Sequence, residues 1–199
     1  MRMELGYTFR TALLLLSLLA TASIQAETTD WTLAQLMLQL TETDRRENRF
    51  SETRELSLLN HTLESKGTLT FTSPDRLSKQ FDPPHGMGYS IEGNRLTIRK
   101  SDGSIETLLL DHSPRLLAYI ASLRAVLAGD LPGLSIYFDT ELKGSSADWQ
   151  LTLLPRESKL SQQVSRIEIT GQKVNIRQFM VVEQSGDRIT TRLYDQRED

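Results

Sequence analysis

The chain has 199 residues, no cysteine and a formal net charge of −3 at pH 7. A chain of this length folds as one ordinary domain, and the lack of cysteine excludes disulfides as a source of its stability. The mild negative charge without a basic stripe argues against nucleic acid as the main partner.

The first 26 residues have the composition of a secretory signal peptide. Arg2 and Arg10 lead into an apolar run with the letters ALLLLSLLA, and the segment ends at the small residue Ala26. The run is shorter than the ~20 apolar residues of a membrane-spanning helix. We expect cleavage after Ala26, with cleavage after Ala22 as the alternative, and a single mature domain over residues 27–199. This mature domain has no cysteine to receive a lipid anchor, so we expect it to be soluble.

Trp31 to Thr43 is predicted to form a helix. Its apolar residues fall at helical spacing and make one face, and Thr29 or Asp30 is placed to cap the first turn. A helix with one apolar face is expected to pack on a sheet.

From Arg49 onward, apolar and polar residues alternate, which predicts β-strands. One strand contains Leu69 and Phe71 and stops at Ser73-Pro74, because a proline cannot donate to a strand ladder. A second apolar run then ends at Phe81.

Later strands are separated by five turn signals. These are Glu92-Gly93-Asn94, Asp102-Gly103, Gly144 to Ala147, Gly171-Gln172 and Ser185-Gly186. Such turns in succession predict an antiparallel meander. The letters FMVV at positions 179–182 are apolar on both faces of their strand, so we expect that strand to be central or to face a partner.

A second helix is predicted from Ser113 to Asp130, with Pro114 in its first turn and Gly129 at its end. Its apolar residues cover more than half of its circumference, so it packs tightly or covers an apolar surface. The letters DLPGLSIYF predict a further short helical turn. One sheet with an apolar face and two apolar helices encloses either a packed core or an apolar cavity, and the pattern leaves both open.

The sequence offers little catalytic chemistry. His61 and His85 stand alone, and with no cysteine they make a poor metal-binding set. Asp111-His112-Ser113 has the letters of a hydrolase triad, but consecutive residues cannot converge on one substrate atom. We interpret Glu52 and Glu55 as part of a solvated strand face. The sequence therefore predicts no catalytic residue, no metal and no cofactor.

The order of these segments resembles the LolA family of periplasmic lipoprotein carriers, from about Trp31 to Tyr194. The letters that carry the resemblance are RFSETRELS, SKGTLTFTSPDRLSKQF, YSIEGNRLTI, SADWQLTLLPR and IRQFMVVEQSGDRITTRL. The resemblance implies an α+β fold, an incomplete and strongly curved antiparallel β-barrel whose helices cover the concave apolar face. On this analogy, the break at Ser73-Pro74 is a bend at the edge of the curved sheet.

The resemblance also implies a cavity for acyl chains. The sheet residues expected to line it are Leu69, Phe71, Tyr89, Leu96 and Ile98. The helix residues expected to cover it are Leu116, Ile120 and Leu123. In familiar carriers an arginine before the proline ties the sheet rim to the helical lid, and here Ser73 precedes Pro74, so we expect a weaker latch.

The expected function is that of a soluble periplasmic carrier, a monomer without cofactor. It would take an acylated lipid or lipoprotein from an inner-membrane exporter and bring it to an outer-membrane acceptor. The sequence lacks the extra C-terminal strand of the enterobacterial type, which widens the expected cargo beyond lipoproteins. An acyl-binding sensor or adaptor on the same fold is the alternative, and a lipid esterase is less favoured.

Overall fold

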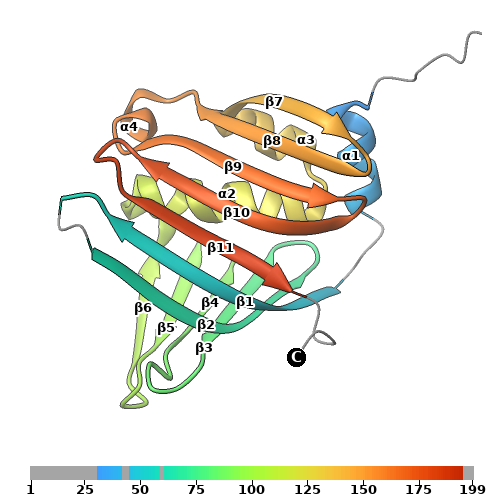
Figure 1. Ribbon diagram of the computed structural model, residues 1–199. Coiled ribbons are helices and arrows are strands. Elements are labelled where there is room, and N and C mark those ends of the chain that lie inside the picture. The colour runs from blue at the N-terminus through green and yellow to red at the C-terminus, as the bar shows by residue number, and fades with distance from the viewer. Residues whose placement is uncertain (1–30, 42–44, 59–60, 195–199) are drawn as a thin grey trace, which may run out of the picture.

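The computed structural model describes residues 31–41, 45–58 and 61–194, so the predicted signal peptide lies outside the described residues. Within them, eleven strands form one sheet, accompanied by four α-helices and one 3-10 helix (Figure 1). The helices are α1 (Leu33–Leu40), η1 (Leu110–His112), α2 (Pro114–Ala128), α3 (Leu131–Tyr137) and α4 (Ser158–Ser161). The strands are β1 (Arg45–Leu56), β2 (His61–Thr72), β3 (Arg76–Phe81), β4 (Gly88–Glu92), β5 (Arg95–Arg99), β6 (Ile105–Leu109), β7 (Phe138–Ser145), β8 (Asp148–Pro155), β9 (Val164–Gln172), β10 (Asn175–Glu183) and β11 (Arg188–Tyr194).

The sheet consists of two series of hairpins that meet where β1 pairs with β11. Its strand order is β6-β5-β4-β3-β2-β1-β11-β10-β9-β8-β7, and each neighbouring pair is antiparallel. The sheet is curved and unclosed, with β6 and β7 as its edges (Figure 1). Each of the five predicted turns connects two paired strands, which confirms the meander, and the fold class that the resemblance implied is confirmed.

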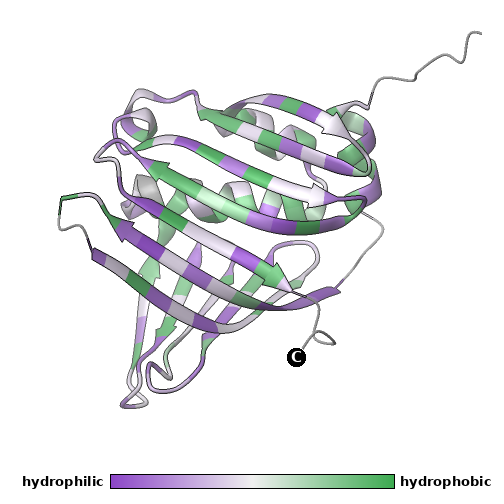
Figure 2. Cartoon of the chain, viewed as in Figure 1, coloured by the Kyte–Doolittle hydropathy of each residue, from purple (hydrophilic) through white to green (hydrophobic). Residues whose placement is uncertain are grey.

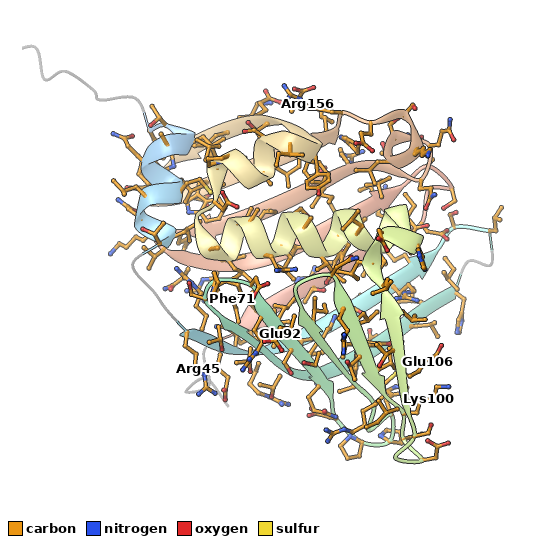
Figure 3. The ribbon with its side chains drawn as sticks, turned by 180° about the vertical axis from the view of Figure 1, so that it is seen from behind. Arg45, Phe71, Glu92, Lys100, Glu106 and Arg156 are labelled. Atoms are coloured by element: carbon orange, nitrogen blue, oxygen red, sulfur yellow. The ribbon has the colours of Figure 1, made fainter. Side chains whose placement is uncertain are left out.

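The concave face of the sheet is apolar and curves around the helices. Directly paired residues of antiparallel strands lie on the same face, so the register assigns Phe50, Leu69, Leu77, Ile91 and Leu96 to this face. All five are buried in one hydrophobic cluster. Figure 2 shows the alternation of hydrophobic and hydrophilic residues along the strands, and Figure 3 shows α2 lying across the concave face.

Local signals set the ends of the helices. Thr32 caps α1 and exchanges hydrogen bonds with Gln35 in a capping box. The predicted capping residues Thr29 and Asp30 lie outside the described residues. Residues 42 and 43, the end of the predicted helix, also lie outside the described part. Gly129 ends α2 with a φ of 66°, a conformation that favours glycine. A Cβ there would lie 2.2 Å from the Met37 carbonyl oxygen, so glycine also lets α1 approach α2.

The predicted bend at Ser73-Pro74 is wrong, because the structure has a hairpin turn at this place. β2 ends at Thr72, and β3 reverses direction and pairs with it. A proline without an N–H fits a turn, where no ladder hydrogen bond is required. Neither β2 nor β3 lies at an edge of the sheet.

The apolar letters at 179–182 lie in β10, which pairs with β9 and β11, so the prediction of a central strand is confirmed. Val181 and Val182 are both buried although they are neighbours. The register shifts between Val182 and Glu183, where β9 carries one extra residue, Ser165.

Candidate functional site

The predicted cavity residues of the sheet come together on the concave face. Tyr89 of β4 pairs with Ile98 of β5, and Phe71 of β2 pairs with Leu77 of β3. Strand β3 thus lies between the predicted residues on β2 and those on β4 and β5. Leu69, Phe71 and Leu96 are buried, and Tyr89 and Ile98 are half-buried at the border of the same cluster. Their role in binding a ligand stays a prediction.

The helix residues predicted to cover this face also belong to the cluster. Ile120 and Leu123 of α2 are buried, and Leu116, nearer the start of the helix, is half-buried. In this structure α2 therefore packs on the concave face (Figure 3). Leu108 of β6 is paired with Leu96 on that face but is 42% exposed, so the apolar surface becomes accessible towards β6.

A polar contact ties α2 to the rim of the sheet. Arg124 of α2 pairs with Asp75 through Nη2 and Oδ2 at 2.7 Å, and its Nη1 donates to the Gly93 carbonyl oxygen at 2.8 Å. The Gly93 N–H in turn donates to Asp75 at 2.9 Å. Asp75 lies in the β2–β3 turn and Gly93 in the β4–β5 turn, so one side chain of the helix connects two turns. We call these three residues the latch.

Ser73, the residue predicted at the latch, makes no contact with α2 among the described side chains. Its side chain is exposed, and the contact with α2 is made by Asp75, two positions further along the same turn. The charge is also reversed, because the arginine comes from the helix and the acceptors come from the rim. The expectation of a weaker latch rested on Ser73 and stays a prediction, whereas the contact described here is an ion pair in which Asp75 is 39% exposed.

A buried ion pair interrupts the apolar face. Lys79 of β3 donates to Glu52 of β1, and the two side chains are only 11% and 9% exposed. Thr191 of β11 donates to the same carboxylate oxygen of Glu52 at 2.9 Å. The interpretation of Glu52 as solvated is therefore wrong, whereas Glu55 is exposed and lies 3.7 Å from Arg188.

Aromatic rings surround the ammonium group of Lys79. Its Nζ lies 4.5 Å from the centroid of the Phe50 ring and 5.2 Å from that of the Phe81 ring, within the range of cation–π attraction. Burial lowers the pKa of Lys79, but the interactions with Tyr119 and Glu52 outweigh it, so the pKa is raised. Of these two residues, Glu52 is the one that accepts a hydrogen bond from Lys79.

The sequence held a signal that Glu52 and Lys79 face the core, which the prediction did not use. Lys79 stands between Leu77 and Phe81 at a spacing of two, and Glu52 follows Phe50 at the same spacing. Alternation therefore places both charges on the apolar face.

A hollow of about 200 Å³ lies apart from the predicted cavity residues, at the end of the sheet next to α1. Arg46, which lines it, donates to the carbonyl oxygens of Val174 at 2.7 Å and Leu40 at 2.8 Å. Burial lowers the pKa of this guanidinium. Arg46 thereby anchors the end of α1 to the β9–β10 turn, which is a structural role.

The histidines do not form a site. His61, His85 and His112 are exposed, and His112 makes only a 3.8 Å contact with its exposed neighbour Asp111. Within the described ranges, no cluster of three or more His, Asp or Glu side chains is arranged to hold a metal ion. None of the helices described is long and apolar enough to cross a membrane.

Comparison with known proteins identifies the family. The family described as "Outer membrane lipoprotein carrier protein LolA-like" matches residues 21–198. No protein of curated function matches the chain.

Solved structures with a similar chain trace are distant in sequence. A LolA superfamily protein from Nitrosomonas europaea is 9% identical, with a TM-score of 0.47 over 82% of this chain and 92% of that one. A putative outer membrane lipoprotein-sorting protein domain from Vibrio parahaemolyticus is 8% identical, with a TM-score of 0.46 over 84% and 92%. MucB from Pseudomonas aeruginosa, solved with MucA, is 14% identical, with a TM-score of 0.38 over 82% and 56%. From the sequence match over residues 21–198, the chain belongs to the family of LolA-like outer membrane lipoprotein carrier proteins.

Proposed function

We propose that the protein is a periplasmic carrier that holds acyl chains between α2 and the concave face of the sheet. It would bring an acylated lipid or lipoprotein from the inner towards the outer membrane, without performing a reaction. The observation that carries this proposal is a helix that covers a wide apolar face and is tied to the sheet rim by the side chain of Arg124. Such a helix can be displaced as a unit.

The energies of exchange favour a lid. Burying a leucine, isoleucine or valine side chain contributes about 1.5–3 kcal/mol, so lifting the four fully buried apolar side chains of α2, Ile120, Leu123, Val126 and Leu127, costs roughly 6–12 kcal/mol. A long acyl chain gains about 0.8 kcal/mol for each buried methylene, or roughly 12 kcal/mol in total. Cargo can therefore replace the helix on the apolar face, and the helix can replace departing cargo.

The direction of transport rests on the family and on the signal-like residues 1–26. We propose that the mature domain, residues 27–199, works as a soluble monomer in the periplasm. An inner-membrane exporter would donate the cargo and an outer-membrane acceptor would receive it. The proposed acyl site is the set of eight apolar residues predicted from the sequence, with the latch at its rim.

Tethering the lid tests this proposal. The chain has no cysteine, so the double variant Asp75→Cys, Arg124→Cys places two unique thiols at the latch. A short, reducible bis-methanethiosulfonate would join them, and stopped-flow fluorescence would follow the uptake of a fluorescent fatty-acyl probe. We expect the tether to block uptake and dithiothreitol to restore it.

The matched control places the same tether between Asp139 and Arg156, a pair of the same kind that joins β7 to the end of β8 at 2.7 Å. This pair lies away from α2, so its tether should leave uptake unchanged. Equal uptake by tethered and reduced Asp75→Cys, Arg124→Cys protein would show that the lid does not open for cargo. Failure of the untethered wild type to bind the probe would refute acyl binding itself.

A further inference from the structure

The Lys79–Glu52 pair is an unusual feature of a face that otherwise buries apolar residues. Removing two charges from water costs several kcal/mol per ion, and replacing such a pair by apolar residues is often neutral or stabilising. Stability alone therefore does not account for the pair. Its position does suggest a role, because Lys79 is paired in the sheet with Leu69 on one side and Tyr89 on the other. Both neighbours belong to the proposed acyl site.

The pair keeps unused hydrogen-bonding capacity. Glu52 accepts from Lys79 and Thr191 through Oε2, and its Oε1 accepts no hydrogen bond from the described residues. The ammonium of Lys79 has three N–H donors, of which one goes to Glu52. The site thus has a free donor on Lys79 next to a free acceptor, Oε1 of Glu52, and the rings of Phe50 and Phe81 form its apolar walls.

We propose that Lys79 and Glu52 form a subsite for the neutral amide group of an N-acylated cargo. This inference rests on the proposed carrier function and specifies its ligand. The carbonyl oxygen of the amide would accept from Lys79, and the amide N–H would donate to Oε1 of Glu52. An amide satisfies both groups at once and adds no charge to a pair that is already neutral.

A free fatty acid fits this subsite poorly. Its carboxylate would lie beside the carboxylate of Glu52 in surroundings that exclude water, where like charges repel strongly. It also carries no N–H for Glu52. The subsite therefore selects amide-linked acyl chains against fatty-acid anions.

Two probes with the same acyl chain test the selectivity. Lauric acid and N-lauroyl ethanolamine would each displace N-phenylnaphthylamine, an apolar fluorescent dye, from the full mature protein. We expect wild type to bind the amide at least about tenfold more tightly than the acid. Glu52→Gln leaves Lys79 as an unpaired cation, so this variant should prefer the acid.

Glu55→Gln is the matched control, because Glu55 lies on the same strand but is exposed and is near Arg188. It should keep the wild-type preference. If Glu52→Gln does not fold, the double variant Glu52→Gln, Lys79→Met carries no buried charge, and its preference for the amide should shrink. An N-lauroyl peptide amide added as a third probe distinguishes an acylated peptide from an amide lipid, since the tighter of the two indicates the source.

The outcomes separate the two proposals. Equal binding of acid and amide by wild type, or a preference that survives both Glu52 variants, would overturn the amide subsite while leaving the carrier intact. Failure of wild type to bind the dye or either probe would refute the acyl site itself. A reversal confined to Glu52→Gln, with Glu55→Gln unchanged, supports the subsite.

Discussion

Replacing Arg124 by methionine should loosen α2 without removing much apolar contact. The variant loses the ion pair with Asp75 and the hydrogen bond to the Gly93 carbonyl oxygen, while methionine keeps most of the side chain's length. Arg124 is 19% exposed but Asp75 is 39% exposed, so water screens the ion pair and it contributes about 1 kcal/mol or less. The hydrogen bond from a charged donor adds about 1.5 kcal/mol. Together they stabilise the closed helix by about 2 kcal/mol, which corresponds to roughly a 30-fold change in the opening equilibrium.

Amide hydrogen exchange of the empty protein measures this effect. We expect protection of the α2 amides from residue 116 to 127 to fall by about 10- to 30-fold, with β8 and β9 unchanged. Arg156→Met is the control (Arg156 is labelled in Figure 3), since Arg156 likewise donates to an aspartate, Asp139, and to a backbone carbonyl, that of Ser135. If both variants lower protection of α2 equally, or neither does, the contact of Arg124 is not a latch.

Two further predictions concern the stability of the sheet. The raised pKa of Lys79 gives stability that is present below the unfolded-state pKa of 10.5 and is lost as pH rises through the higher folded-state pKa. We expect the double variant Glu52→Gln, Lys79→Met to have about the same free energy of unfolding in urea as wild type near neutral pH. Above about pH 10.5 the variant should lose less of it than wild type. Equal losses of stability with rising pH would contradict this prediction. Gly67→Ala should destabilise by about 3 kcal/mol, because its Cβ would lie 1.9 Å from the backbone oxygen of Gln80. Gly88→Ala, where the nearest atom is the movable end of the Gln80 side chain, should cost clearly less, and equal losses would refute the steric argument.

Much of the fold was predictable because its signals are local. Alternation and turn residues are properties of neighbouring positions, so the hairpins β4–β5, β5–β6, β7–β8, β9–β10 and β10–β11 could be predicted from the letters alone. The pairing of β1 with β11 could not, since it joins segments far apart in the chain. The turn at Pro74 was misinterpreted because a proline indicates only that a ladder hydrogen bond is missing. Whether the chain bends or reverses there depends on which strands pair, which the proline does not determine.

The burial of the apolar residues at the candidate site was predictable, and its polar contacts were missed. Burial of Phe71 and Ile120 follows from alternation and from the helical pattern, which are visible in one dimension. The partner of a charge depends on which strands lie side by side, so Glu52 and Lys79 could be recognised as a pair only through β2, which separates them. Nothing in the sequence distinguishes Arg124 from a surface residue of an apolar helix, because its partners Asp75 and Gly93 lie in turns far away in the chain.

The meeting of β1 and β11 in the middle of the sheet also governs how the protein folds. Ser51 and Tyr194, whose hydroxyls lie 2.9 Å apart across these strands, are separated by 143 positions in the sequence. Each series of hairpins can form from local contacts, but joining them requires closing a very large loop, which slows folding. Until β11 arrives, each half displays part of an apolar concave face to its surroundings. While its two halves are unjoined, the chain therefore exposes apolar surface that is prone to aggregation.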